Sequence, residues 1–279
     1  MNHREILKQY GIRAKKSLGQ NFLVNDEILN TIAESIDITG HNIIEIGPGY
    51  GALTTKILAQ NPKSLTLIEL DKEMVLILRA RIRDGDIIIP NGTNFNIVET
   101  DILRYNPVNQ DYTIIANIPY YITSPILFRF LHELDHKPDE MLILMQKEVA
   151  DKIRRTKWYH NSYLSLAMEY ATEEIREVLS VSRENFIPAP KVDSNVLYFK
   201  SKKEYDKAEA KKFLNIVSAG FVSPRKKLIS NLASRFPIPK EQFADIFKKL
   251  NLTETVRAEE LGIGEWRKLL SLLQREIIT

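Results

Sequence analysis

The sequence of 279 residues contains no cysteine. This absence excludes disulfide bonds, thiolate metal sites and a cysteine nucleophile, and it fits a reducing compartment. The sequence also lacks any apolar run near the ~20 residues that a membrane-spanning helix needs. The longest runs, such as 74–78 and 141–145, have the length of a buried strand or helix segment. We therefore expect a cytoplasmic protein without a membrane partner.

The charged residues are unevenly distributed along a chain of otherwise ordinary composition. Apolar residues make up 44% and charged residues 27% of the chain, as in globular proteins with room for one large or two modest domains. The net charge is +4 over residues 1–20, −8 over 21–199 and +7 over 200–279. Basic ends that flank an acidic middle indicate that the ends meet a polyanion, with a solvated basic surface as the alternative. The first 18 residues lack the apolar centre of a signal peptide, so we expect them in the mature protein.

Apolar periodicity predicts alternating strands and helices through the first half of the chain. The strands are expected at 42–46, 65–70, 96–99, 112–116 and 140–145, and the helices at 52–59, 71–83 and 124–134. Further helices are expected at 147–155 and 162–171, and further strands at 175–181 and 194–199. This alternation is typical of an α/β fold with a parallel sheet covered by helices on both faces.

The composition changes at Lys200-Ser201-Lys202-Lys203, after which only helical patterns follow. We therefore predict an α/β domain with a basic N-terminal segment at 1–200 and a small helical domain at 201–279. Because the helical domain carries a large share of the positive charge, we expect it to bind a polyanion such as RNA.

Glycines mark the loop between the first predicted strand and its helix, Glu45-Ile46-Gly47-Pro48-Gly49-Tyr50-Gly51. They allow the backbone to turn tightly and to approach a ligand closely. Glu69 ends the second strand, where a carboxylate can accept hydrogen bonds from both hydroxyls of a ribose. Asp101 follows the third strand, where it can accept a hydrogen bond from an adenine amino group. These residues together predict a pocket for an adenosine-containing cofactor.

A nicotinamide dinucleotide is the competing ligand, since Gly47-x-Gly49-x-x-Ala52 also fits its fingerprint. Glu45 argues against it, because a carboxylate is poorly placed beside a pyrophosphate but tolerable beside the cationic end of an amino acid. No hydride-transfer partner is evident in the sequence. S-adenosylmethionine is therefore the favoured cofactor.

The buried strand at 112–116 leads directly into Asn117-Ile118-Pro119-Tyr120-Tyr121. An amide accepts and donates hydrogen bonds, a proline restricts the backbone, and an aromatic ring offers a flat face. These three features suit the binding of a planar amino-bearing ring, such as a nucleobase. The segment holds no titratable general base, so we expect positioning and dipoles to carry the catalysis.

One segment matches a metal-binding motif in sequence but lacks the other features of a metal site. His132-Glu133-Leu134-Asp135-His136 matches the H-E-x-x-H signature of zinc peptidases. The two histidines fall at the end of a predicted helix, two residues before Pro138, and no third ligand is evident. We expect surface histidines and no metal site.

A resemblance to a known family is carried by segments at 19–23, 45–51, 68–71, 117–120, 146–149, 186–194 and 257–259. They resemble the small-subunit ribosomal RNA adenine N6,N6-dimethyltransferases, the kasugamycin-sensitivity dimethyltransferases, over nearly the whole chain. The runs at 186–194 and 257–259 separate this family from the large-subunit rRNA methyltransferases that confer macrolide resistance. Ile118 and Glu260 depart mildly from the family, where leucine and asparagine are common. Since Ile118 would act through its backbone carbonyl, we expect no loss of activity.

The resemblance implies a Rossmann-like class I S-adenosylmethionine-dependent methyltransferase sheet with a small all-helical C-terminal domain. The implied substrate is a pair of adjacent adenosines in the 3′-terminal hairpin loop of small-subunit rRNA, each dimethylated at N6 late in subunit assembly. The implied partner is a pre-ribosomal particle. The protein is expected to bind it as a monomer and to hold no metal. The cofactor contacts carried over by position are Asn21, Leu23, Gly47, Glu69, Asp101 and Asn117.

Catalysis is expected to depend on the Asn117 side-chain oxygen and the Ile118 carbonyl, which would accept the two N6 hydrogens of adenine. Tyr120, with Phe186 opposite, would stack on the base and fix its plane. Arg225, Lys226 and Lys227 precede an apolar helix start and are the expected RNA contacts. Cations are unfavourable at a helix N-terminus, which favours a polyanionic partner over simple solvation.

Two other functions remain open. One is a non-catalytic binding factor on the same scaffold, as in related mitochondrial transcription factors or an assembly checkpoint. The other is the large-subunit methyltransferase, which the motifs at 186–194 and 257–259 disfavour.

Overall fold

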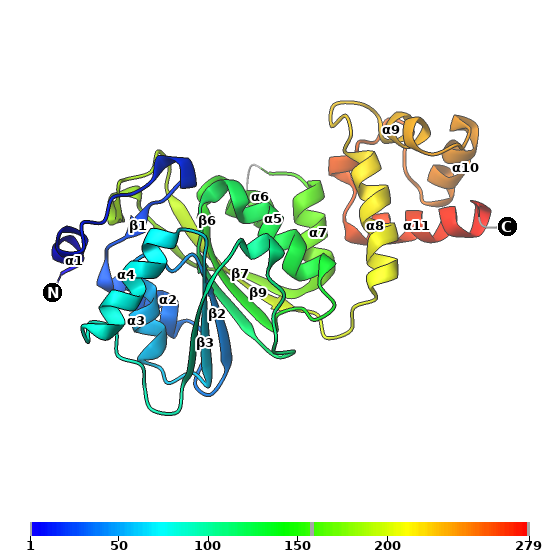
Figure 1. Cartoon of the computed structure of the whole chain (residues 1–279). Coiled ribbons are helices and arrows are strands. Elements are labelled where there is room, and N and C mark those ends of the chain that lie inside the picture. The colour runs from blue at the N-terminus through cyan, green and yellow to red at the C-terminus, as the bar shows by residue number, and fades with distance from the viewer. Residues whose placement is uncertain (1, 157–158, 278–279) are drawn as a thin grey trace. The chain divides into compact units, whose positions relative to one another are not determined.

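A computed structural model describes residues 2–156 and 159–277. The chain forms two compact units (Figure 1). The first contains Met1–Ala150 and Glu174–Ser201, and the second contains Asp151–Glu173 and Lys202–Thr279. Residues 151–173 thus group with the C-terminal helices, although the sequence pattern assigned them to the first domain. The functional domain limits of 1–200 and 201–279 stay a prediction.

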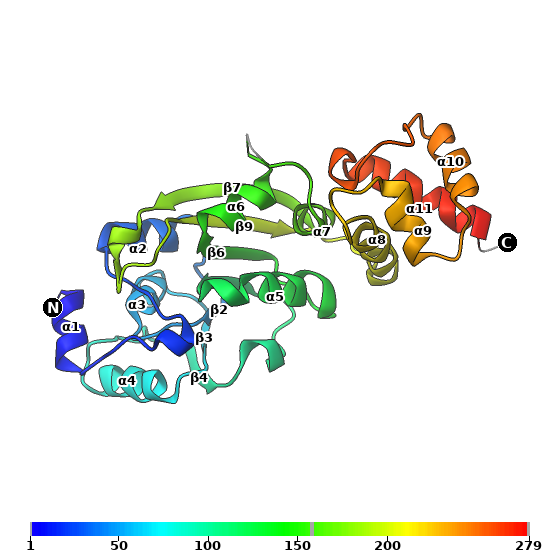
Figure 2. The ribbon, with the colours of Figure 1, turned by 90° about the horizontal axis from the view of Figure 1, so that it is seen from above.

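A seven-stranded sheet runs through the first unit in the order β4-β3-β2-β5-β6-β9-β7. The strands are β2 (Asn42–Ile46), β3 (Ser64–Glu69), β4 (Asn94–Glu99), β5 (Thr113–Asn117), β6 (Glu140–Gln146), β7 (Thr172–Val181) and β9 (Ser194–Ser201). The first five are parallel, as predicted. β9 departs from the prediction because it pairs antiparallel with β6, and β7 and β9 point in opposite directions in Figure 2. The sheet is therefore mixed.

The apolar strands are explained by burial on both faces. Ile43, Leu65 and Ile115 belong to the core on one face, together with α2 (Asp26–Glu34), α3 (Ala52–Leu58) and α4 (Lys72–Arg83). Ile44 and Ile114 are buried as well, although alternate side chains of a strand point to opposite faces. Helices therefore cover both faces, as the alternation of elements predicted.

β2 lies between β3 and β5 in the sheet. The chain runs outward from β2 through β3 to β4 and then crosses back to form β5 on the other side of β2. The connections after β2 and β5 consequently leave the sheet in opposite directions. Open α/β sheets bind ligands at this switch point, outside the carboxyl ends of the strands.

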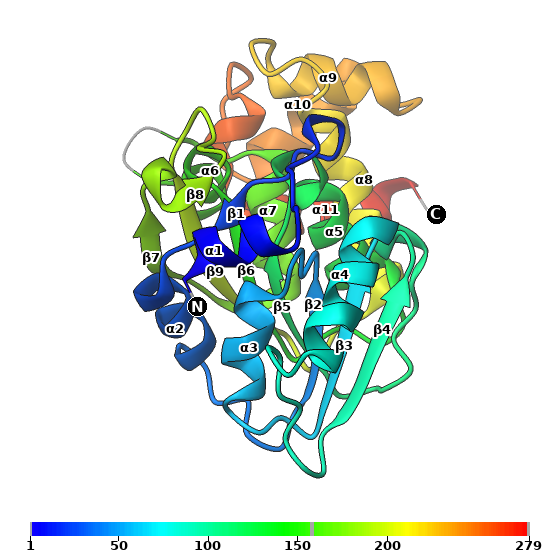
Figure 3. The ribbon, with the colours of Figure 1, turned by 60° about the vertical axis from the view of Figure 1, so that its left-hand side comes forward.

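Short elements connect the N-terminal segment to this edge of the sheet. β1 (Phe22–Leu23) pairs antiparallel with β8 (Phe186–Ile187) (Figure 3), which joins residues more than 160 positions apart. The helix α1 (His3–Gln9) precedes β1, and Asn2 caps it in a capping box with Glu5. The N-terminal residues are therefore part of the packed unit.

The predicted helix at 124–134 has two parts. α5 (Thr123–Phe128) continues into a π-helical turn at Arg129–Glu133. Within it, His132 is 7% exposed, with its ring 5.6 Å from that of Phe128, whereas His136 is exposed. The prediction of a surface position was wrong for His132, because α-helical spacing does not hold in this wider turn. Among the described residues, no group of three or more His, Asp or Glu side chains is arranged to hold a metal ion.

The second unit is helical and has its own core. α6 (Lys147–Arg154) enters it and is followed by α7 (Tyr163–Ala171), α8 (Lys207–Gly220), α9 (Leu228–Arg235), α10 (Lys240–Lys249) and α11 (Ile263–Ile277). Its buried side chains include Leu166, Phe213, Val217, Leu232, Phe247 and Trp266. All of these except Leu166 lie in the helical pattern predicted after residue 201. No helix in the described part of the chain has both the length and the apolar character that a membrane span requires.

Candidate active site

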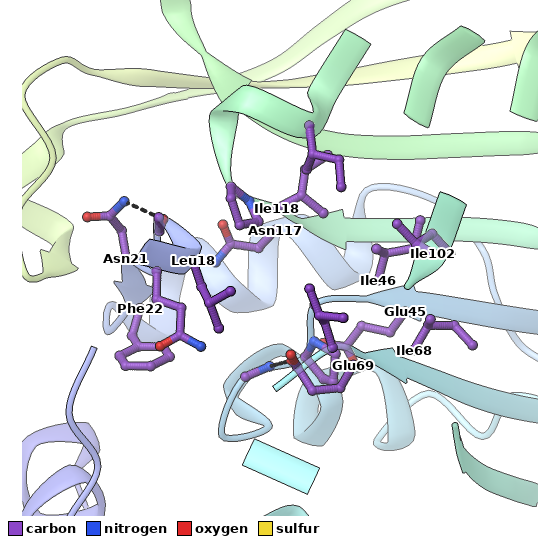
Figure 4. A pocket seen from close by; sticks show the side chains of 18 of the residues that line it. Leu18, Asn21, Phe22, Glu45, Ile46, Ile68, Glu69, Ile102, Asn117 and Ile118 are labelled. Carbon is purple, nitrogen blue, oxygen red and sulfur yellow. Dashed lines mark hydrogen bonds between the residues drawn. The ribbon is translucent and has the colours of Figure 1, made fainter. Parts of the chain in front are cut away.

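A cavity opens at the carboxyl ends of β2, β3 and β5, with an empty volume of about 1060 Å³ that includes space open to solvent. The cavity is lined by these predicted site residues: Asn21, Leu23, Gly47, Glu69, Asp101, Asn117, Ile118, Tyr120 and Phe186. In Figure 4, Glu69 and Asn117 lie at the ends of their strands, and Glu45 lies on the strand between them.

The glycine loop brings the backbone close to the cavity. Gly47 has φ 67°, and a Cβ atom added there would lie 3.5 Å from the carbonyl oxygen of Asn117. Gly49 has φ 56°, and its added Cβ would lie 3.2 Å from the Phe22 ring. Both φ values disfavour other residues. The loop therefore leaves a wall of bare backbone where a ligand can approach.

Glu69 lies beside this loop and is 7% exposed. Its Oε2 accepts a hydrogen bond from the Gly49 amide at 3.2 Å, and its Oε1 accepts one from the Asp71 amide at 2.8 Å. Burial raises the pKa of Glu69, and the backbone amides oppose this rise. Each oxygen keeps a further lone pair, so the fixed carboxylate can still accept hydrogen bonds from two hydroxyl groups.

Asp101 occupies the corresponding position after β4. Its Oδ1 accepts a hydrogen bond from the Leu103 amide at 2.9 Å, so the side chain caps the short turn at Ile102–Arg104. Its Oδ2 accepts no hydrogen bond from the described residues. Asp101 therefore presents a second acceptor to the cavity, of the kind that an amino group requires.

Glu45 is fully buried beneath the glycine loop. Thr54 Oγ1 donates a hydrogen bond to its Oε2 at 2.7 Å. Burial raises the pKa of Glu45 to about 8, so the carboxyl group is mainly neutral at pH 7.

The N-terminal segment contributes residues that the sequence patterns missed. Lys15 Nζ and Gln20 Nε2 donate hydrogen bonds to the two oxygens of Asp71, at 2.7 and 2.9 Å. Burial alone would raise the pKa of Asp71, but these bonds hold it below its usual value. Asp71 also caps α4 and donates its amide to Glu69. Gln20 and Asp71 lie in the segments 19–23 and 68–71 that resemble the family, but the sequence does not reveal that they contact each other.

Asn117 ends β5 and is half-buried at the cavity wall. Within the described chain its side chain makes no hydrogen bond, so its amide can bind a ligand. Ile118 is buried and lines the same cavity. An amide oxygen and a neighbouring carbonyl oxygen can accept two hydrogens from one amino group.

Two aromatic residues from distant parts of the chain line the same cavity. Tyr120 begins a 3₁₀ turn at Tyr120–Ile122, is half-buried, and shares a hydrogen bond with Ser194 at 2.7 Å. Burial raises the pKa of its phenol, so the hydroxyl is protonated at neutral pH. Phe186 is buried in β8, opposite Leu23 in the strand register. Their rings provide the flat apolar surface that a base can stack on.

The basic triplet lies in the second unit and does not line this cavity. Arg225, Lys226 and Lys227 are all exposed in the turn between α8 and α9, and α9 begins directly after them at Leu228. The buried Asn231 donates hydrogen bonds to the carbonyl oxygens of Gly220 and Ser223, at 2.6 and 3.0 Å. The turn is thus anchored while its three cations face solvent.

Comparison with known proteins gives concordant results. The sequence model of the ribosomal RNA adenine dimethylase family matches residues 11–275. The chain is 35% identical over 259 residues to ribosomal RNA small subunit methyltransferase A of Malacoplasma penetrans, with 91% of this chain and 90% of that protein covered. It is 37% identical over 292 residues to the protein of the same name in Geobacillus sp. WCH70, with 97% and 95% covered.

Two solved structures share the fold. A dimethyladenosine transferase from Plasmodium falciparum has a TM-score of 0.72 at 23% identity, with 90% of this chain and 97% of that chain covered. The 23S rRNA methyltransferase ErmE has a TM-score of 0.69 at 24% identity, with 91% and 100% covered. These similarities confirm the predicted class I methyltransferase fold.

Proposed function

Because the chain belongs to the ribosomal RNA adenine dimethylase family, we propose that it dimethylates N6 of two adjacent adenosines in the 3′-terminal hairpin loop of small-subunit rRNA. The enzyme is an S-adenosylmethionine-dependent rRNA adenine dimethyltransferase. The proposal extends this to the loop, to a late pre-ribosomal particle as substrate, and to a monomer that acts in the cytoplasm.

One structural observation supports the proposal most strongly. Three acceptor groups, on Glu69, Asp101 and Asn117, line a single cavity together with the aromatic rings of Tyr120 and Phe186. The acceptors follow three different strands of the sheet. This combination can bind the ribose and amino group of one nucleoside and the ring of a second.

The residues around the glycine loop fit the adenosine part of the cofactor. Gly47 and Gly49 remove the side chains that would fill this wall, and Glu69 is held by two amides as an acceptor for ribose hydroxyls. When bound, S-adenosylmethionine supplies an electrophilic methyl group. The task of this chain is therefore to improve a poor nucleophile, because the N6 lone pair of adenine is delocalised into the ring.

Asn117 and Ile118 are suited to that task. The Asn117 side-chain oxygen and the Ile118 carbonyl would accept the N6 hydrogens, two before the first transfer and one before the second, and favour a tetrahedral nitrogen whose lone pair points at the methyl group. After each transfer one N6 proton is released to solvent. Tyr120 and Phe186 would fix the plane of the base for an in-line approach. Since residues 117–121 hold no carboxylate, histidine or lysine, preorganised dipoles and orientation replace a general base.

The RNA must deliver an unstacked base to the cavity. A hairpin loop lowers this cost, because its bases are less constrained than those of a duplex. Arg225, Lys226 and Lys227 would bind the phosphate backbone, which contributes affinity and salt dependence more than sequence specificity.

The proposed function is tested by transfer of labelled methyl groups to small-subunit particles and to large-subunit RNA in parallel, followed by digestion to nucleosides. We expect dimethyladenosine in the small-subunit RNA alone, within the 3′-terminal loop. Label in the large-subunit RNA would contradict the proposal and favour the large-subunit methyltransferase. Particle binding without transfer would favour the non-catalytic binding factor.

A further inference from the structure

The hydroxyl of Tyr120 has a partner from a distant part of the chain. It lies 2.7 Å from Ser194 Oγ, and the two residues are 74 positions apart in the sequence. Ser194 is the first residue of β9 and is 0% exposed. It pairs with Gln146 in the register of β6 and β9, inside the seven-stranded sheet. The serine is therefore a rigid anchor.

Tyr120 requires such an anchor because its backbone position alone does not fix its ring. It lies in a short 3₁₀ turn that links β5 to α5, and it is half-buried at the cavity wall. The hydrogen bond to Ser194 fixes the far end of the ring, while the turn fixes its Cα atom. A ring held at both ends cannot swing into or out of the cavity, so its plane is set before a base arrives.

The segment that ends at Ser194 also carries the second aromatic wall. Phe186 lies in β8 and is placed by its pairing with Leu23. Hydrogen bonds to Asp193 hold the end of the loop between Phe186 and Ser194. The Asp193 side chain accepts one from the Arg183 amide at 3.0 Å. The Asp193 carbonyl accepts a further bond from the Lys147 amide at 3.0 Å. The segment from Arg183 to Ser194 thus positions the rings of both Phe186 and Tyr120.

We propose that Ser194 is a positioning residue that sets the plane of Tyr120 for stacking on the target adenine. This inference rests on the proposed function. It assigns Ser194 no contact with the substrate, the cofactor or the transferred methyl group. The serine acts through the tyrosine hydroxyl, and its loss should therefore be equivalent to the loss of that hydroxyl.

The test compares Ser194→Ala, Tyr120→Phe and the double variant in methyl transfer to small-subunit particles. Each single variant should lower kcat about five- to tenfold, the range for one lost hydrogen bond, with little change in the KM for S-adenosylmethionine. The double variant should be no slower than either single variant, because the two substitutions break the same contact. The inference would be overturned if the fold reductions in kcat of the two single variants multiplied in the double variant. It would also be overturned if the Ser194→Ala variant were as fast as the wild type.

Ser201→Ala is the matched control. Ser201 lies at the other end of β9, is buried, and has an Oγ without a hydrogen-bond partner among the described residues. Its substitution should leave kcat unchanged, which separates the role of Ser194 from a general effect of losing a hydroxyl from this strand.

A crystal structure of Ser194→Ala gives a readout that does not depend on the reaction. Tyr120 should adopt more than one side-chain rotamer, and a single unchanged rotamer would contradict the inference. Failure of the proposed function is recognised separately, because the wild-type protein would then transfer no methyl groups to small-subunit particles.

Discussion

The Gly49 amide donates a hydrogen bond to Glu69 Oε2 over 3.2 Å, and this contact joins the glycine loop after β2 to the carboxylate that ends β3. The Asp71 amide holds the other oxygen at 2.8 Å. Because both oxygens are fixed by backbone groups, the carboxylate keeps one orientation. The wall of the cavity is thus preorganised before a cofactor binds.

Glu69→Gln should weaken the binding of S-adenosylmethionine about 10- to 100-fold, because an amide can accept from only one of the two backbone donors and offers fewer acceptors to a ribose. Isothermal titration calorimetry measures the dissociation constant. Glu73→Gln is the control, since the Glu73 side chain is more than half exposed and forms an ion pair with Lys15. Equal weakening in both variants would show that the local charge matters more than the Glu69 contacts.

Asn117→Ala should lower turnover about 10²- to 10³-fold, the usual loss for one preorganised transition-state contact. Cofactor affinity should change less, because the predicted role of the Asn117 oxygen is to bind the substrate amino group. Single-turnover methyl transfer and calorimetry separate the two effects. A rate near that of the wild type would refute the assignment.

For the wild type, the rate should be flat from about pH 7 to 9, since no side chain needs to lose a proton.

Glu45 should make the stability of the protein depend on pH. Its pKa is raised by burial from 4.5 to about 8 in the folded state. Between these values the unfolded chain loses the proton while the folded protein keeps it, so the free energy of unfolding falls as the pH rises. Glu45→Gln should remove this part of the slope, on the order of a few kcal/mol between pH 5 and 8.

Urea unfolding at pH 5, 6.5 and 8 measures the Glu45 effect as the difference between variant and wild type. This subtraction is needed because Glu69, whose pKa is also raised, contributes a slope of the same sign in both proteins. Identical slopes would show that Glu45 ionises normally in the folded state.

Replacing Arg225, Lys226 and Lys227 with alanine should weaken particle binding and reduce its salt dependence. Each lost phosphate contact should lower the slope of log K against log salt by about 0.7 to 0.9. Filter binding at several salt concentrations measures this slope. A triple variant of Lys240, Lys248 and Lys249, which are exposed on α10, removes the same charge. If the slope of log K against log salt changed equally in both variants, the effect would result from net charge and not from contacts of the turn between α8 and α9.

Gly220→Ala should destabilise the helical unit by about 1–3 kcal/mol, the usual cost of overpacking. An added Cβ atom would clash with Cη2 of the buried Trp266 and would lie 2.9 Å from Leu228 Cδ1. Gly264→Ala is the matched control, because nothing lies within 4 Å of a Cβ added there in α11. Urea unfolding followed by circular dichroism should show a lower midpoint for Gly220→Ala and an unchanged or higher one for Gly264→Ala.

The alternation of strands and helices and the approximate place of the cofactor cavity could be predicted from the order of the residues. β2, β3 and β5 could be predicted because strands buried on both faces are continuous apolar runs. The residues that follow them could be grouped because the carboxyl ends of parallel strands share one edge of a sheet. Local pattern was sufficient for both conclusions.

The contacts between distant segments could not be predicted, because they form when separate parts of the folded chain pack together. The antiparallel pairing of β9 with β6 brings Ser194 to Tyr120, and the N-terminal segment brings Lys15 to Asp71. The same packing buries Glu45 and raises its pKa. Such contacts depend on which surfaces meet after the chain has folded, and neither periodicity nor residue spacing encodes that choice.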